Sequence, residues 1–343
     1  MLSEKSKTKR GILLAADIMT VALPLTLFFR AEIPYSLKLI LQGAGYTWAT
    51  IIVCFVPFGL CAEPIRFGMK LMAPDLAVPK VKIFACLCLL SALMVIGGYI
   101  NATSPIVREL SFDLRTGNST GVEYDIAAVT DLHAGKLMSR KRVGNIVTSI
   151  NQMTPDLVLL GGDILDDFDV KQSGAAEEFK RLKAPLGKYT VLGNHEYYLG
   201  GKWSKEFLEK HGLTVLVDES VIVDGKFILV GRNDFAALQR GGTREPLVQL
   251  ISQGNKLPVI VLDHTPAQLE EAQKAGVALQ ISGHTHYGQI FPINFIIDHL
   301  YEKGWGILQK GKTWYYVSCG VGFWGPPLRT NSRPEILLIH IKV

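Results

Sequence analysis

Three long apolar runs dominate the first hundred residues of the chain. They cover residues 11–29, 44–62 and 83–100, and Asp17 is the only charged residue within them. Each run approaches the ~20 apolar residues that an α-helix needs to cross a bilayer. Polar, basic segments separate the runs, whereas the core helix of a soluble protein would be amphipathic. The pattern predicts a membrane region over residues 1–100 with about three transmembrane helices.

The remaining residues follow the pattern of an α/β domain. Residues 101–121 are polar and are predicted to form a linker and a first edge strand, around 107–114. From 122 to 343 apolar runs alternate with amphipathic ones, which indicates strands alternating with helices. After Tyr287 the pattern becomes β-rich, ending in a strand at 335–342. The other strands are expected at 124–130, 157–161, 188–192, 213–217, 226–230, 258–262 and 277–282, and the helices at 139–152, 174–183, 203–210, 243–252 and 265–275.

Charge separates the same two parts of the chain. The net charge of +5 belongs to residues 1–100, which hold ten Lys or Arg and five Asp or Glu; residues 101–343 hold 26 of each. A neutral globular domain without a basic stripe argues against nucleic acid as a partner. The bilayer is the partner that residues 1–100 predict.

The basic residues of the short loops predict the orientation in the membrane. Such residues collect on the cytoplasmic side, and the first loop carries only Arg30 and Lys38. With three spans, the tail and the second loop then face the cytoplasm. We therefore expect a multi-pass protein of the cell membrane with an extracytoplasmic globular domain. The eight basic residues of the tail and the second loop are Lys5, Lys7, Lys9, Arg10, Arg66, Lys70, Lys80 and Lys82.

Five short islands of metal-ligand residues follow predicted strands. They are DLH at 131–133, GDILD at 162–166, GNHE at 193–196, DH at 263–264 and GHTH at 283–286, and they hold five of the eight histidines. Imidazoles, carboxylates and an amide oxygen are the ligand types of a two-metal centre. Sites in α/β sheets form beyond the carboxyl ends of the strands. If the backbone of the last island is extended, His284 and His286 point to the same side.

The order of these motifs resembles the calcineurin-like metallophosphoesterases. The series DxH, GDxxD, GNHE, a lone His and GHTH carries the resemblance, which covers residues 109–343. LDHTP, SGHTHYGQI and WGPPLRT, between residues 262 and 330, are most similar to the bacterial membrane-anchored branch. The resemblance implies an α/β fold of four layers, an α-β-β-α sandwich, preceded here by the membrane region.

The resemblance also implies a role for each residue of the motifs. It assigns Asp163 as the bridge between two divalent ions (Mn, Fe, Zn or Ni), whose bridging hydroxide would attack phosphorus. His195 would be the catalytic residue that donates a proton to the leaving oxygen or steadies the phosphoryl charge, while Asp166 and Glu196 would orient imidazoles. The first metal would be held by Asp131, His133 and His286, and the second by Asn194, His264 and His284.

The sequence predicts a membrane-anchored phosphoesterase acting on a phosphomonoester, phosphodiester or pyrophosphate. The apolar segment 291–305 is either core packing or a rim that touches the bilayer, and the second reading favours a lipid-linked substrate. Some relatives cleave UDP-2,3-diacylglucosamine in lipid A synthesis, but that alternative needs a cytoplasmic site. A metal-binding sensor or scaffold without turnover is the alternative of another class. Intact Asp163 and His195 argue against it, because binding alone needs neither.

Overall fold

The computed structural model describes residues 4–28, 33–73, 80–115, 121–251 and 256–343. They fall into two compact units, Met1–Ile100 and Asn101–Val343. Three parts of the sequence-based predictions lie outside the described residues: position 29 of the first span, positions 116–120 of the linker, and position 252 of a predicted helix.

The first unit is helical, with α1 (Glu4–Phe28), α2 (Tyr35–Met72) and most of α3 (Lys80–Ala102). In the described part of the chain two helical segments are long and apolar enough to cross a membrane, Ile40–Met72 and Val81–Ala102. The predicted span at 11–29 falls on α1, where the apolar stretch Leu13–Thr26 is shorter. The predicted span at 44–62 lies within α2, which already begins in what the sequence suggested was the first loop.

The second unit contains two six-stranded sheets. Their central strands, β2–β3–β4 and β7–β8–β9, are parallel. The first sheet has the order β1 (Ile106–Asp113), β12 (Glu335–Lys342), β2 (Glu123–Val129), β3 (Leu157–Leu160), β4 (Lys188–Thr190) and β5 (Thr214–Val215). The second has the order β10 (Gly306–Lys310), β11 (Thr313–Val317), β9 (Leu279–Ser282), β8 (Val259–Leu262), β7 (Phe227–Gly231) and β6 (Glu219–Val223).

The sheets stack face to face because alternate residues of their strands point to opposite sides. Ile126 of β2 and Leu229 of β7 are buried in one core cluster that draws on both sheets. Their neighbours Ala127 and Val230 belong to two other clusters, which helices cover. The result is the four-layer α-β-β-α sandwich that the resemblance implied.

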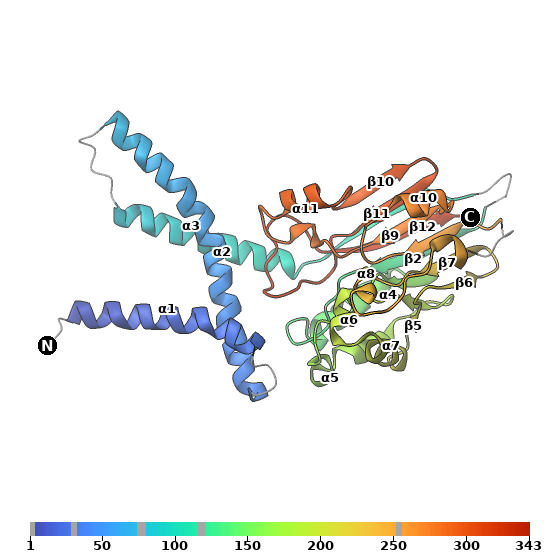
Figure 1. The fold of residues 1–343 in the computed structure, drawn as a ribbon, viewed down its shortest axis with the longest axis horizontal. Helices are drawn as coiled ribbons and strands as arrows, with labels where there is room; N and C mark the ends of the chain where they lie inside the picture. Colours follow the sequence, from blue (N-terminus) through green and yellow to red (C-terminus); the bar gives the residue numbers. More distant parts are fainter. Residues whose placement is uncertain (1–3, 29–32, 74–79, 116–120, 252–255) are drawn as a thin grey trace. The chain divides into compact units, whose positions relative to one another are not determined.

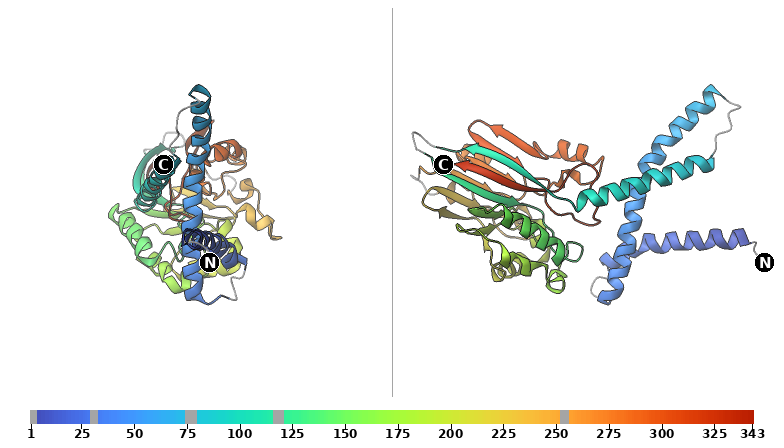
Figure 2. Two further views of the ribbon diagram at one scale, coloured as in Figure 1. Left: turned by 90° about the vertical axis from the view of Figure 1, so that its left-hand side faces the viewer. Right: turned by 180° about the vertical axis from the view of Figure 1, so that it is seen from behind.

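Helices flank each sheet. The green segments of residues 140–210 lie together on one flank of the sandwich in Figures 1 and 2. Their apolar residues join those of the first sheet, whereas Leu247 and Ala272 pack on the second sheet. The helices are α4 (Arg140–Gln152), α5 (Val170–Ser173), the 3₁₀ helix η1 (Ala175–Arg181), α6 (Asn194–Leu199), α7 (Gly201–Lys210), α8 (Phe235–Leu238), α9 (Leu247–Leu250), α10 (Glu270–Lys274), the 3₁₀ helix η2 (His286–Gly288) and α11 (Asn294–Leu300).

The strands predicted between 107 and 282, and the strand at 335–342, are all present within a few residues of their expected ends. The predicted helices are less accurate. The helix expected at 174–183 is the 3₁₀ helix η1, and the one expected at 265–275 begins only at Glu270. Gln268 has a left-handed backbone (φ 53°), which an α-helix cannot include. The helix expected at 243–252 is reduced to α9, which Pro246 precedes.

The carboxyl ends of the parallel strands meet at one end of the sandwich. In Figure 1 this end, which also carries α11, lies opposite the C-terminus of the chain. Strand β1 begins at the same end, because it runs parallel to β12, whose last residues approach the C-terminus. The loops after β2, β3, β4, β8 and β9 can therefore converge there.

Candidate metal centre

Each predicted ligand lies just beyond a strand, as the sequence indicated. Asp131 and His133 follow β2, Asp163 follows β3, and Asn194 follows β4 as the first residue of α6. The remaining ligands follow β8 and β9. Five of the seven have left-handed backbone conformations, which are rare outside glycine and cluster at functional sites. These five are Asp131 (φ 53°), His133 (52°), Asp163 (50°), His284 (71°) and His286 (46°).

Two glycines let the backbone segments approach closely. A Cβ at Gly193 would overlap the carboxylate of Asp163, and a Cβ at Gly283 would overlap the carboxylate of Asp131. Only glycine can occupy these positions without displacing a candidate ligand. The glycines of the GNHE and GHTH motifs are therefore explained by the packing of one loop against another.

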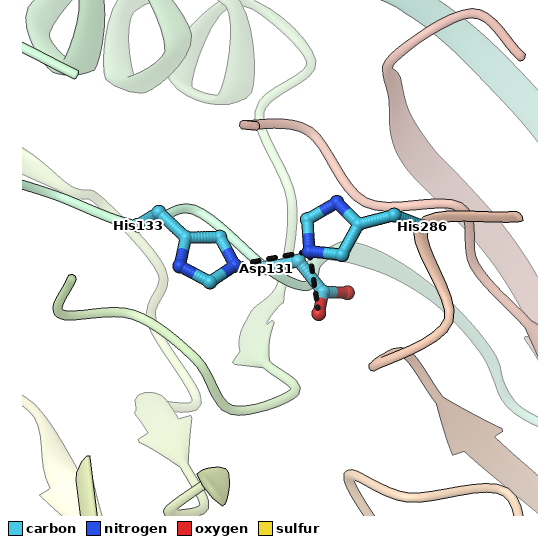
Figure 3. Close-up of side chains that lie close together, drawn as sticks. All are labelled: Asp131, His133 and His286. Atoms are coloured by element: carbon cyan, nitrogen blue, oxygen red, sulfur yellow. Dashed lines mark hydrogen bonds and ion pairs between the residues drawn. The ribbon is translucent and has the colours of Figure 1, made fainter. Parts of the chain in front are cut away.

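The first candidate cluster consists of Asp131, His133 and His286. The Nε2 atoms of the two imidazoles face each other at 3.0 Å, and Oδ1 of Asp131 lies 3.5 Å from Nε2 of His286. Figure 3 shows the two rings turned toward each other beside the carboxylate. All three side chains are buried. Three donor atoms thus converge on one point, as a metal ion requires.

The second candidate cluster consists of Asp163, His264 and His284, and Asn194 joins it. Oδ1 of Asn194 lies 2.8 Å from Nδ1 of His284 and 3.3 Å from Nε2 of His264. Nδ1 of His264 lies 2.8 Å from the carbonyl oxygen of Gly161, so it donates a proton there. This hydrogen bond fixes the tautomer and turns the free lone pair of Nε2 toward the cluster.

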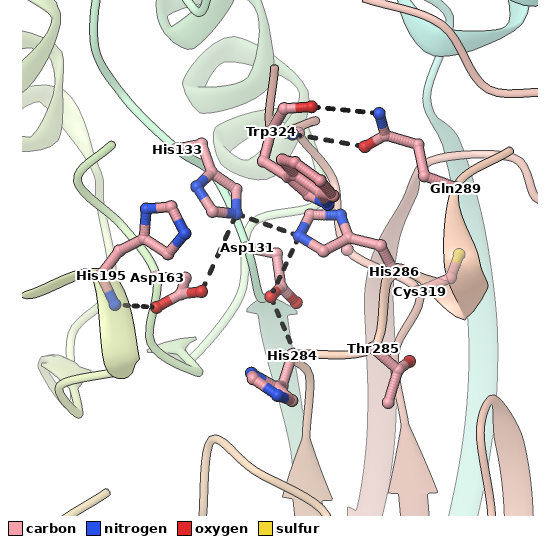
Figure 4. A network of polar contacts seen from close by, with 12 residues as sticks. Asp131, His133, Asp163, His195, His284, Thr285, His286, Gln289, Cys319 and Trp324 are labelled. Atoms are coloured by element: carbon pink, nitrogen blue, oxygen red, sulfur yellow. Dashed lines mark hydrogen bonds and ion pairs between the residues drawn. The ribbon is translucent and has the colours of Figure 1, made fainter. Parts of the chain in front are cut away.

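Asp163 lies between the two clusters. Its Oδ2 is 3.3 Å from Nε2 of His264 in the second cluster and 3.9 Å from Nε2 of His133 in the first. Its Oδ1 accepts a hydrogen bond of 2.9 Å from the backbone N–H of His195. Figure 4 shows this carboxylate directed toward both His133 and the backbone of His195. The carboxylate of Asp163 can thus reach both ligand clusters.

His195 and Asp166 form a pair beside the first cluster. Oδ1 of Asp166 lies 3.3 Å from Nδ1 of His133 and 3.4 Å from Nδ1 of His195. Burial opposes protonation of His195, but the contact with Asp166 and the charge of Asp163 raise its pKa to about 9. Its side chain is half-buried, so a protonated imidazole remains accessible from the solvent side. Asp166 thus contacts two imidazoles, those of His133 and His195.

Glu196 differs from expectation. It contacts backbone rather than an imidazole, accepting hydrogen bonds from the N–H groups of Gly193 (2.7 Å), Asp163 (3.0 Å) and Leu165 (2.8 Å). Burial and the nearby carboxylate of Asp163 raise the pKa of Glu196 to about 7. Glu196 therefore fixes the relative position of the loops after β3 and β4.

The last two ligands do not share one side of an extended backbone. Both have left-handed conformations, and His286 begins η2. As a result, His284 joins the second cluster and His286 the first. The backbone of this island is therefore not extended, and the two histidines do not point to the same side. Each still lies in the cluster to which the resemblance assigned it.

Arg329 is a contact of the site that the sequence did not identify. It is fully buried, and its Nη2 lies 3.1 Å from Nδ1 of His286 while also donating to the carbonyl of Gly322. Burial, His133 and Arg329 together lower the pKa of His286 and favour the neutral imidazole that a metal ligand must be. The only sequence signal was a charge within the turn-rich WGPPLRT segment.

The donor set fits divalent metal ions. Two carboxylates, Asp131 and Asp163, are buried among imidazoles, and burial of such charges is costly without a cation. Among the described residues, none donates a hydrogen bond to Oδ2 of Asp131. Asp263, by contrast, does not join either cluster, because it forms a buried ion pair of 2.6 Å with Arg244.

Known proteins are similar in sequence to the part of the chain that carries the two clusters. The model of the calcineurin-like phosphoesterase family matches residues 124–288. An uncharacterized metallophosphoesterase of Aquifex aeolicus is 34% identical over 256 residues, which cover 73% of this chain and 97% of the relative. An uncharacterized metallophosphoesterase of Helicobacter pylori is 33% identical over 248 residues, covering 71% of this chain and 66% of the relative.

A vertebrate relative carries the word transmembrane in its name. The transmembrane protein with metallophosphoesterase domain of Danio rerio is 28% identical over 274 residues, 74% of this chain and 61% of the relative. The chain thus spans about two thirds of the length of the Helicobacter and Danio proteins. The Aquifex relative, matched over nearly its whole length, establishes the family. The chain belongs to the calcineurin-like metallophosphoesterases, a superfamily of metal-dependent phosphoester hydrolases.

Proposed function

We propose that the domain at 122–343 hydrolyses a phosphoester with two divalent ions and is anchored by a membrane region at 1–100. The observation that carries the proposal is the position of Asp163, with a carboxylate oxygen 3.3 Å from His264 and 3.9 Å from His133. A site that binds a single ion would not need one carboxylate shared by two ligand clusters. In the proposal, one ion would be held by Asp131, His133 and His286, the other by Asn194, His264 and His284, and Asp163 would be shared by both.

The residues of the chain supply orientation and a proton. Bound divalent ions would activate water and neutralise charge on the phosphoryl oxygens. His195 stands beside Asp163, and its contact with Asp166 favours a proton on the imidazole. It can donate this proton to the leaving oxygen, or steady the phosphoryl group by hydrogen bonding. Asp166 holds the ring of His195 for either role through its contact with Nδ1.

The role of Asp163 as a ligand shared by two metal ions is tested by Asp163→Ala in the purified full chain. Because the variant lacks the shared ligand, we expect fewer than two Mn²⁺ per chain by elemental analysis. Hydrolysis of an aryl phosphodiester should fall by several orders of magnitude. The exposed Asp113→Ala is the control and should retain both metals and activity. Two metals and near-full activity in Asp163→Ala would contradict the assignment, and a wild type that binds metal without turnover would favour the sensor alternative.

The role of His195 is tested by varying the leaving group. We expect His195→Ala to retain both metals but to slow turnover about 10²–10⁴-fold for a poor leaving group that needs a proton. The loss should shrink for a good leaving group such as a nitrophenol. His340→Ala, at a histidine of β12 that contacts Asp125, is the matched control. An equal loss for good and poor leaving groups would exclude proton donation and favour positioning.

We further propose that the catalytic domain lies outside the cytoplasm. Arg66, Lys70, Lys80 and Lys82 surround the connection between α2 and α3, and their charge favours the cytoplasmic side. If α3 crosses the membrane, the residues after it lie on the other side. The basic N-terminal tail satisfies the same rule only if α1 also crosses, which gives three spans.

The orientation is tested with a reporter enzyme that is active only outside the cytoplasm. Fused after Lys342, the reporter should be active, because α3 would carry the domain across. The same reporter inserted between α2 and α3 is the control and should be inactive. The reverse result would place the site in the cytoplasm. It would then favour the alternative of a pyrophosphatase acting on UDP-2,3-diacylglucosamine.

A further inference from the structure

Helix α11 exposes its apolar residues to solvent as well as its polar ones. In the part of the chain that the structure describes, none of its seven residues is buried. Phe295 is 64% and Leu300 67% exposed, whereas Oδ2 of the polar Asp298 accepts a hydrogen bond from Tyr287. Water disfavours an apolar face of this kind, which usually marks an interaction surface.

The exposed apolar residues form a patch around this helix. Its six members come from α11, from the segment before it, and from the loop after β11. We call these residues the α11 patch: Phe291, Ile293, Phe295, Ile296, Leu300 and Trp324. The two segments are joined through Gln289, which exchanges hydrogen bonds with the backbone of Trp324.

The α11 patch borders the metal centre. The segment leaves the site at His286 and returns to it, since Oγ1 of Thr285 donates to the carbonyl of Gly304 at 2.7 Å. Tyr301, which follows α11, lies against the ring of His284 with 6.0 Å between centroids. Trp324 is 54% exposed, and its backbone is hydrogen bonded to Gln289, three residues after the candidate ligand His286. The apolar surface is therefore the rim of the site.

The loop beside this rim is hydrogen bonded to Asn101, near the end of the last candidate span. Asn101, the penultimate residue of α3, belongs to the second unit and donates from Nδ2 to the carbonyls of Arg329 (3.0 Å) and Ser332 (2.8 Å). Between these two residues, Thr330 accepts a hydrogen bond of 2.9 Å from the backbone of Phe291. One short loop therefore joins the end of the span to the first residue of the patch.

We propose that the α11 patch inserts into the surface of the bilayer that α3 crosses, so that the metal centre opens toward lipid headgroups. The span ends at Ala102 and β1 begins at Ile106, so the connection is too short to carry the rim far from the membrane. Ala102 is itself buried in the domain core. The exposed Arg333, which donates to the carbonyl of Ser104 beside the span, adds a cation suited to anionic headgroups.

This placement specifies a class of substrate for the proposed function, on which this step depends. A soluble substrate gains nothing from an apolar rim. A lipid whose phosphoester lies at headgroup depth would reach the metal centre while its acyl chains remain in the bilayer or against the patch. We infer that the substrate is a membrane lipid that carries a phosphoester.

Membrane contact is tested by photolabelling, which does not depend on turnover. The full chain is reconstituted into phosphatidylcholine and phosphatidylglycerol vesicles that contain a phosphatidylcholine with a diazirine in its acyl chain. After irradiation and digestion, we expect lipid adducts on peptides from 289–305 and around Trp324, in addition to α2 and α3. Peptides with equally exposed apolar residues elsewhere, Ile222 (58%) and Val248 (56%), should stay unlabelled.

Three results would overturn the proposal. Adducts confined to residues 1–102 would show that the rim does not touch lipid. Equal labelling of Ile222, Val248 and the patch would show non-specific access. Cross-links from the patch to a second copy of the chain, in place of lipid adducts, would assign it to a protein interface.

The substrate class is tested with the double variant Phe295→Ser and Leu300→Ser. We expect a roughly tenfold loss of turnover for a phospholipid-like ester embedded in vesicles, because apolar contact with the bilayer is lost. Turnover of a soluble aryl phosphodiester should fall much less, and the control Ile222→Ser and Val248→Ser should affect neither substrate. Equal losses on both substrates would refute the lipid assignment. A wild type inactive on both would refute the proposed function and leave the photolabelling result standing.

Discussion

The face-to-face packing of two sheets with parallel central strands is the constraint on which the site depends. Residues such as Ile126 and Leu229 hold the sheets together, so the strands cannot shift without exposing the core to water. Because β2–β3–β4 and β7–β8–β9 end on the same side, five loops meet there. The apolar core thereby determines where the carboxylates and imidazoles converge.

The convergence of these carboxylates would by itself cost free energy, because it concentrates negative charge in a buried place. The protein offsets part of that cost with its own groups: backbone N–H groups donate to Asp131, Asp163 and Glu196. These bonds also hold the loops in left-handed conformations that are unfavourable for residues with side chains. Bound cations would complete the compensation. Backbone strain, buried carboxylates and metal binding are thus parts of one arrangement.

The sequence predicted those strands and ligands that depend on the local pattern of apolar residues. Buried parallel strands are continuous apolar runs, so β2, β3 and β8 were evident, and each ligand island follows such a run. Helix α11 was missed because none of its residues is buried, and β6 was missed because only one of its three apolar residues, Val223, is buried. Arg329 was missed because a charge becomes significant only when folding buries it against His286. The partners of Glu196 are backbone groups, which no side-chain motif encodes.

The position of β12 has a consequence for biosynthesis. The last strand of the chain lies between β1 and β2, the first two strands of its sheet. While the ribosome makes the chain, β1 therefore has no neighbour in its sheet, and the β1 edge stays open until residues 335–342 emerge. The apolar helices α2 and α3 precede it and can enter a membrane long before that moment. The sheet is incomplete until residues 335–342 emerge, and its open β1 edge can pair wrongly until then.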